Sequence, residues 1–149
     1  MDEDHDDEAE KEIACRHLLL CRTIWFTGDL DDGFSLGRLV VHLRPQEHRF
    51  PFICETRLFL FCQLYGDPGE YTARIELIPI TMGEDGEQVE GEHTPFGPWL
   101  IPLYGQEFVE SFAFPLYKLP FGSPGIYEFR LVFDELPDWW AAERVEVKE

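Results

Sequence analysis

The chain has 149 residues, of which 44% are hydrophobic and 15% aromatic, and its formal net charge is −18. A chain of this length and apolar content is expected to fold as one domain and is too apolar to be disordered. The negative charge would repel nucleic acid and anionic membrane surfaces, so we expect neither as a partner. No apolar run approaches the roughly 20 residues that span a bilayer, and the acidic start differs from a basic signal peptide, which predicts a cytoplasmic protein.

The first twelve residues form an acidic run. Residues 1–12 hold eight acidic side chains against the single base Lys11, and like-charged runs of this kind are usually solvated. We therefore predict an acidic disordered tail over residues 1–12 and one β-domain over residues 13–149. The alternative is that the tail contacts a basic partner.

The domain begins with a stretch in which both the odd-numbered and the even-numbered residues are mostly apolar. Residues 13–26 therefore predict a strand buried on both faces, although residues 12–21 could form a short helix instead. A turn is expected at residues 28–33, followed by a second strand over residues 34–43. Residues 44–49 are polar and contain Pro45, which predicts a connection.

The middle of the chain carries the most apolar segment. Residues 53–64 predict a central strand, which a Pro-Gly turn separates from another strand over residues 71–80. The dipeptide Asp85-Gly86 is a hairpin turn signal. Residues 94–104 hold three prolines among large apolar side chains, so this segment cannot be a central strand.

The last third predicts three further strands. Phe108, Phe112 and Phe114 alternate in phase, and a second Pro-Gly turn leads into a strand that ends at Phe133. Residues 134–138 close a hairpin, and the more polar residues 142–148 predict an edge strand. About seven strands with little helical periodicity predict two packed antiparallel sheets, an immunoglobulin-like β-sandwich.

The two Pro-Gly turns lie in a repeated motif. Residues 66–74 and 122–130 share the sequence Gly-x-Pro-Gly-x-Tyr-x-x-Arg, in which Pro-Gly suits a type II turn that launches a strand. In each copy the tyrosine shares one strand face with three apolar residues further along. Arg74 and Arg130 point to the opposite face, where we expect cross-strand ion pairs with neighbouring acids.

Several of these features together resemble a bacterial family known only as a domain of unknown function, an immunoglobulin-like sandwich of similar length. The resemblance covers most of the chain and lies in the cysteine and glycine turn of residues 21–33, in Phe50-Pro51, and in Pro-Gly-x-Tyr-x-Phe-Arg-Leu over residues 124–131. A Pro-Gly-x-Tyr turn also occurs in sandwiches with a tyrosine corner, whose hydroxyl bonds to nearby backbone. The chain departs from the family in its acidic tail, in Trp139-Trp140 and in residues 94–104. The resemblance implies a fold and no activity.

No catalytic constellation is recognisable in the sequence. It lacks a nucleophile elbow, a P-loop, a dinucleotide fingerprint and a His-Glu-x-x-His motif, so we expect a protein that is not an enzyme and needs no cofactor. The histidines are scattered, which favours surface positions over a zinc site. The cysteines lack Cys-x-x-Cys spacing and are expected to be small buried hydrophobes, with a disulfide or metal site as the alternative. These are Cys15, Cys21, Cys54 and Cys62.

The aromatic and apolar residues of the proline-rich segment give the main functional hypothesis. They are too proline-interrupted for a sheet interior and too apolar to lie comfortably in water, and exposed apolar patches usually mark interfaces. The segment is therefore expected to bind a protein partner, or a second copy of the chain, as a non-catalytic interaction or assembly module. The alternative is that it covers the open end of the core. The residues concerned are Phe96, Trp99, Leu100, Ile101 and Tyr104.

A second hypothesis is a small-ligand module for carbohydrate or calcium. Trp139 and Trp140 offer flat rings for a sugar, but adjacent strand residues face opposite ways, so only one ring is available on a given face. The turn residues Asp29, Asp31 and Asp32 could coordinate calcium, although their spacing fails the EF-hand rule.

Overall fold

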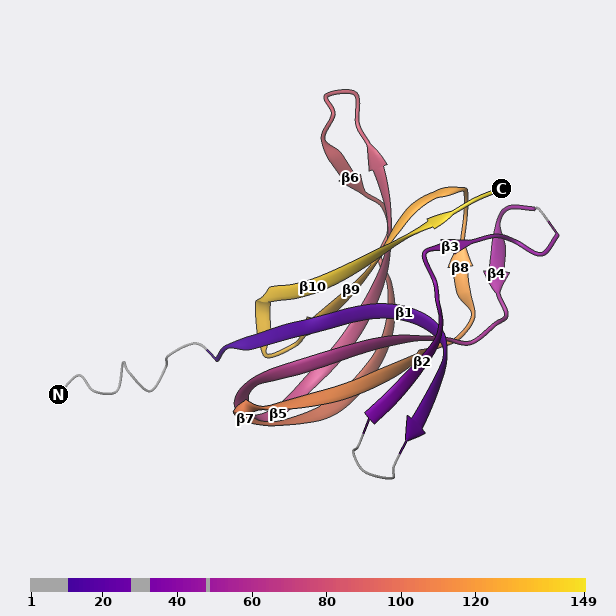
Figure 1. Ribbon diagram of the computed structural model, residues 1–149. Helices are drawn as coiled ribbons and strands as arrows, with labels where there is room; N and C mark the ends of the chain where they lie inside the picture. The colour runs from indigo at the N-terminus through magenta and orange to yellow at the C-terminus, as the bar shows by residue number, and fades with distance from the viewer. Residues whose placement is uncertain (1–10, 28–32, 48) are drawn as a thin grey trace.

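A computed structural model describes residues 11–27, 33–47 and 49–149 of the chain, and all regular structure among them is β-strand (Figure 1). No described segment forms a helix of the length and apolarity that crossing a bilayer requires. The all-β fold class predicted above is confirmed. The strands are β1 (Ile13–Thr27), β2 (Gly33–Leu39), β3 (His42–Leu43), β4 (Phe52–Cys54), β5 (Leu58–Met82), β6 (Gln88–Glu90), β7 (Thr94–Leu116), β8 (Leu119–Phe121), β9 (Gly125–Phe133) and β10 (Leu136–Val147).

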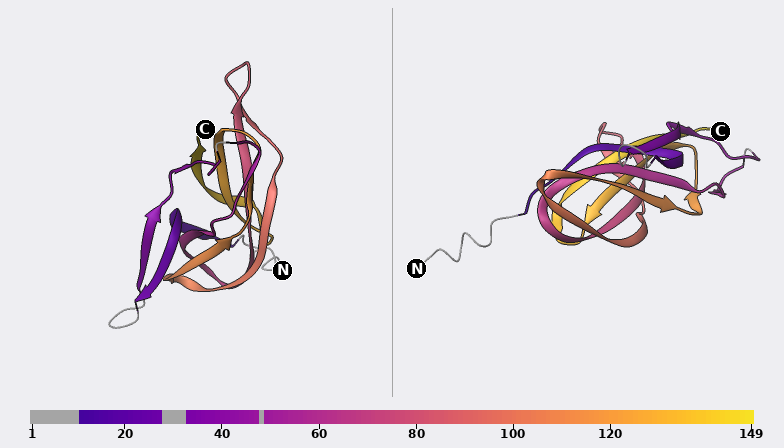
Figure 2. Two further views of the ribbon diagram at one scale, coloured as in Figure 1. Left: turned by 90° about the vertical axis from the view of Figure 1, so that its right-hand side faces the viewer. Right: turned by 60° about the horizontal axis from the view of Figure 1, so that its bottom comes forward.

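Eight of these strands form one curled sheet. Its main order is β2-β1-β5-β9-β10-β3, with β6 and β7 also paired to β5, and β4 and β8 form a separate two-stranded sheet. Every pair is antiparallel except the short contact between β10 and β3. The hairpin that joins β5 to β6 projects away from the rest of the sheet (Figures 1 and 2). The immunoglobulin-like strand order stays a prediction.

The long strands β5 and β7 carry the sheet from one layer into the other. The first part of β5, residues 58–66, pairs with β1 on one side and with the end of β7 on the other. The later part, residues 73–80, pairs with β9 and lies against the start of β7. Both strands bend at the same place (Figure 1). The sheet therefore folds over on itself, and the core lies between its two halves.

Side chains of one parity fill this core, as alternation along a strand requires. They are buried along both parts of β5 and along β9, and the predicted inward faces of both motif copies are confirmed. The inward residues of these strands are Leu58, Leu60, Cys62, Leu64, Tyr71, Ala73, Ile75, Leu77, Tyr127, Phe129, Leu131 and Phe133.

The two copies of the motif form the same tyrosine corner. The Tyr71 hydroxyl donates to the carbonyl oxygen of Asp67, and the Tyr127 hydroxyl donates to that of Ser123, each at 2.7 Å. The glycine of each copy has a positive φ, 151° at Gly69 and 146° at Gly125, which favours glycine. These angles differ from the φ of about +80° in a type II turn, so the predicted turn type is wrong.

The structure also corrects where strands begin and end. The first motif copy lies inside β5 and does not separate two strands, because the ladder with β7 absorbs the extra residues as irregularities on both sides of Gly66. A side chain at Gly66 would meet the Glu12 carbonyl oxygen at 2.5 Å, so its glycine allows β1 to approach the bend. Residues 94–104 form the first half of β7, where they pair with β5 alone. The predicted exclusion from a central position is confirmed.

Candidate functional sites

Strand β7 divides the predicted partner-binding residues between two faces. Phe96 and Trp99 are partly buried against the core, and Ile101 belongs to it. The Trp99 ring lies 4.9 Å from the Phe114 ring, centroid to centroid. These three side chains therefore cover the core, which is the alternative role that the sequence analysis left open.

The other two predicted residues point outward. Leu100 is 66% exposed and Tyr104 is 60% exposed. Two further exposed side chains of the same strand, Phe108 and Val109, were not included in the predicted set. Together these four residues, which are between 39% and 66% exposed, are called the β7 surface below.

A bulge in β7 explains why Phe108 is exposed although it is in phase with the partly buried Phe112 and the buried Phe114. Gly105 lies opposite Gly66 and Glu110 lies opposite Leu64, so β7 carries extra residues between these pairs. The bulge changes which face each residue occupies. The only sequence signal for it is the polar interruption Gly105-Gln106-Glu107 between apolar residues.

Polar contacts fix this bulge to the start of β1. Gln106 Nε2 donates to the Glu12 carbonyl oxygen and to Asp67 Oδ1, both at 3.2 Å. The Asp67 carboxylate also accepts the Glu12 amide at 2.8 Å. That amide bond, followed by the Gln106 bond, lowers the pKa of Asp67. The ionised carboxylate therefore helps to hold the bend of β5, the bulge of β7 and the start of β1 together.

The paired tryptophans face opposite ways. The Trp139 indole donates to the Ile13 carbonyl oxygen at 2.8 Å, and its ring packs 5.1 Å from Phe133. Trp140 is exposed, with the Arg130 guanidinium 4.3 Å from its ring centroid. Only Trp140 therefore offers a ring to a ligand, whereas Trp139 joins β10 to the start of β1.

The candidate metal ligands gain no support from the described residues. Asp29, Asp31 and Asp32 lie outside the part of the chain that the structure describes. Within that part, no group of three or more His, Cys, Asp or Glu side chains is arranged to hold a metal ion.

The four cysteines are free thiols. Cys21 and Cys62 are fully buried, as predicted for small hydrophobes, and Cys15 and Cys54 are partly buried. Burial raises the thiol pKa in all four cases, which disfavours the nucleophilic thiolate.

One buried carboxylate lies on the outer face of the second layer. Glu128 is 2% exposed, and its oxygens accept from Arg130 Nε at 2.8 Å and Arg144 Nε at 3.0 Å. Arg130 also contacts Glu90 of β6 at 2.8 Å. The carboxylate is thus fully paired between arginines, an arrangement that suits a structural role rather than proton transfer.

A histidine extends this network. His93 Nδ1 lies 2.8 Å from Glu76, and its Nε2 lies 2.9 Å from Glu90. Ionised carboxylates only accept hydrogen bonds, so both ring nitrogens must carry a proton for both bonds to form. The bond to Glu76, and then that to Glu90, raises the pKa of His93 against the opposing effect of burial.

Comparison with known proteins found little. No family model matches the chain, and no curated protein matches it. Similar solved structures include β-glucosidase from Listeria innocua in complex with gluconolactone, in complex with glucose, and in a third crystal structure, with TM-scores of 0.47, 0.48 and 0.46 and identities of 12%, 11% and 11%. The matches cover 94%, 93% and 92% of this chain but 16% of each enzyme chain. These likenesses are too distant to carry an argument.

Proposed function

We propose that the chain is a non-catalytic protein-interaction module that binds its partner through the β7 surface. The observation that carries the proposal is the run of four large, exposed apolar side chains along one strand that pairs on one side only among the described strands. Exposed apolar residues that gather in this way usually mark a binding site.

The character of the strand suggests how a partner would bind. Prolines at positions 95, 98 and 102 interrupt the edge of β7, and proline cannot donate to a new strand. Leu100 and Tyr104 would therefore bind mainly through side-chain contacts. Residues 103–114 contain no proline, so an extended segment of the partner could also pair with the backbone there.

Charge narrows the class of partner. Glu70, which lies opposite Pro102, and Glu107 beside Phe108 are exposed at this surface. Acidic residues around an apolar patch attract a basic partner and repel an acidic one. A basic, apolar protein segment therefore fits the β7 surface better than a second copy of this acidic chain.

A double variant tests the proposal. Leu100→Ser with Tyr104→Ser removes exposed apolar area and leaves the core intact, so binding should fall while the unfolding midpoint stays unchanged. Met82→Ser is the matched control, because Met82 is 65% exposed at the end of β5, away from the strand in question. Affinity capture and light scattering should show a partner that wild type and Met82→Ser retain and the double variant loses. Equal retention by all three proteins would contradict the proposal.

A carbohydrate-binding module is the second candidate, because Trp140 presents an exposed ring. The ring could stack on one sugar face, whereas the Arg130 guanidinium beside it already donates to Glu128 and Glu90. Titration with a panel of glycans should then change tryptophan fluorescence in wild type and not in Trp140→Ala. A calcium site would need Asp29, Asp31 and Asp32, and it stays a prediction.

A further inference from the structure

Positive charge is concentrated in the first half of the domain. Residues 13–65 carry six arginines against five acidic residues, whereas residues 66–149 carry five basic residues against seventeen acidic ones. Three of the six arginines, Arg22, Arg44 and Arg49, line the same pocket. An otherwise acidic protein therefore gathers cations at one place.

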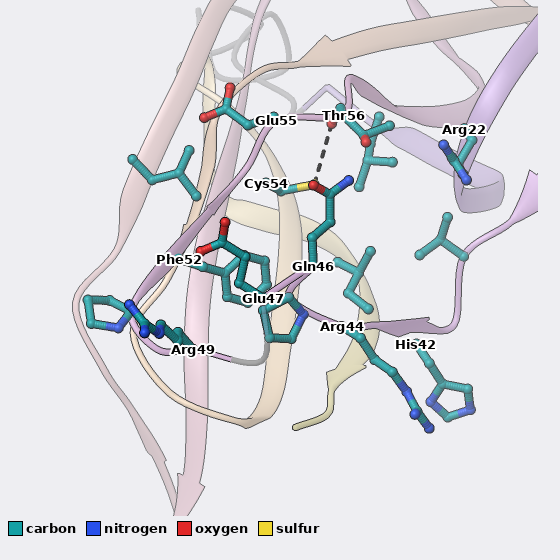
Figure 3. A pocket seen from close by; sticks show the side chains of 16 residues that line it. Arg22, His42, Arg44, Gln46, Glu47, Arg49, Phe52, Cys54, Glu55 and Thr56 are labelled. Carbon is teal, nitrogen blue, oxygen red and sulfur yellow. Dashed lines mark hydrogen bonds between the residues drawn. The ribbon is translucent and has the colours of Figure 1, made fainter.

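The pocket lies between β1, the connection from β3 to β4, and the residues that follow β4 (Figure 3). Its volume is about 630 Å³, within the range of about 300–1,000 Å³ that small-molecule sites occupy. In Figure 3, Arg22, Arg44 and Arg49 lie at three separate places around the pocket, and the Arg44 side chain extends away from its middle, beside His42. Burial raises the pKa of the Cys54 thiol, and its hydrogen bond to the Thr56 carbonyl oxygen and then the charge of Arg22 oppose that rise.

The three arginines have no ion-pair partner among the residues that the structure describes. Glu47 and Glu55 also line the pocket, but neither lies within 4.0 Å of them. By contrast, Arg74, Arg130 and Arg144 in the second half pair with Asp134, Glu90 and Glu128. His42, at the pocket edge, contacts Glu146 at 3.3 Å. The pocket arginines are therefore free to bind an external anion.

The remainder of the lining is mostly apolar. Leu58 is a buried lining residue, and Leu43, Phe52 and Ile53 contribute further apolar surface. Guanidinium groups bind carboxylate and phosphate through paired hydrogen bonds, and apolar walls hold an apolar body. We propose that this pocket binds a small amphipathic organic anion, with its oxyanion group held by the arginines that line the pocket and its apolar part against Phe52 and Ile53.

The probes are benzoate, phenyl phosphate, benzyl alcohol and benzylammonium, titrated into the full chain and followed by backbone amide chemical shifts. The first two distinguish a carboxylate from a phosphate head group, and the last two lack the anion. We expect one or both anions to change the amide chemical shifts of residues 40–58, and we expect their binding to weaken at higher salt. The alcohol and the cation should leave these chemical shifts unchanged.

Charge-removing variants complete the test. Among Arg22→Gln, Arg44→Gln and Arg49→Gln, at least one should weaken anion binding by roughly tenfold, the loss expected for a hydrogen bond to a charged group. Arg74→Gln is the matched control, because Arg74 pairs with Asp134 outside the pocket. Binding that is equal in all variants, binding of benzyl alcohol as tight as that of benzoate, or no binding of either anion would overturn the proposal. The β7 surface is not involved, so this result and the partner test stand apart.

Discussion

At the scale of single residues, His93 links two elements through charge. It bridges Glu76 of β5 and Glu90 of β6, and Glu90 in turn contacts Arg130 of β9. The bond to Arg130, followed by that to His93, lowers the pKa of Glu90, while Glu76 chiefly raises that of His93. The protonated imidazole thus holds the base of the projecting β5–β6 hairpin against the sheet.

This arrangement predicts a pH dependence of stability. Because the folded pKa of His93 is raised above the ordinary value of 6.5, its contribution is fully present below pH 6.5 and is lost as the pH rises through the folded pKa. Wild type should therefore lose stability across that window relative to His93→Asn, whose neutral side chain does not titrate. Denaturant unfolding at a series of pH values measures the difference, and parallel curves for the two proteins would count against the bridge.

The sequence predicts part of this residue-scale picture. The opposite-face position of Arg74 and Arg130 and their cross-strand pairing with acids are confirmed, since Arg74 binds Asp134 and Arg130 binds Glu128 and Glu90. The second arginine that binds Glu128, Arg144, comes from β10, and the register between β9 and β10 cannot be predicted from the sequence. Alternation fixes the face of a side chain, but only the pairing of strands decides its neighbours.

At the scale of elements, the two tyrosine corners fix the entry of the chain into β9 and the bend of β5. Each hydroxyl donates to a backbone carbonyl four residues earlier. The Tyr127 hydroxyl also accepts the Ser123 amide at 3.2 Å. The two corners therefore have the same structure, and the second copy has one additional hydrogen bond.

Removing these hydroxyls should reveal the difference. Tyr71→Phe should lower the free energy of unfolding by about 1 kcal/mol, because a buried side chain loses one hydrogen bond, and Tyr127→Phe should cost more. Tyr117→Phe is the control, because among the described residues its exposed hydroxyl contacts Arg57 alone, and its loss should cost less than about 0.5 kcal/mol. Chemical denaturation measures all three. A corner variant as stable as Tyr117→Phe would show that its hydroxyl bond adds nothing.

The sequence identified these corners but not the strands that contain them. Pro-Gly usually ends a strand, so residues 53–64 and 71–80 were expected to be separate, whereas β5 continues through the first corner. Prolines likewise obscured β7, because they suit an edge strand as well as a loop. Local patterns give turn chemistry reliably, but whether a strand continues past a corner depends on pairing with distant residues.

At the scale of the whole molecule, the bent pair of strands β5 and β7 both fills the core and presents exposed apolar side chains at the surface. The buried side chains of β7 cover the core, and four exposed apolar side chains of the same strand form the β7 surface. Acidic residues dominate this second half, and three arginines that have no ion-pair partner among the described residues line the pocket in the first half. We therefore infer two binding regions of opposite character on one sandwich, an acidic apolar strand for a protein and a basic pocket for a small anion.

The measurement that tests this account most directly is partner retention by Trp99→Ala alongside its stability. Trp99 packs on Phe114 beneath the β7 surface, so its loss should lower the free energy of unfolding by about 3 kcal/mol. Below its unfolding transition, the variant should still retain the partner that Leu100→Ser with Tyr104→Ser loses. A Trp99→Ala protein that stays as stable as wild type and loses its partner would contradict the account, because the buried face of β7 would then be the binding face.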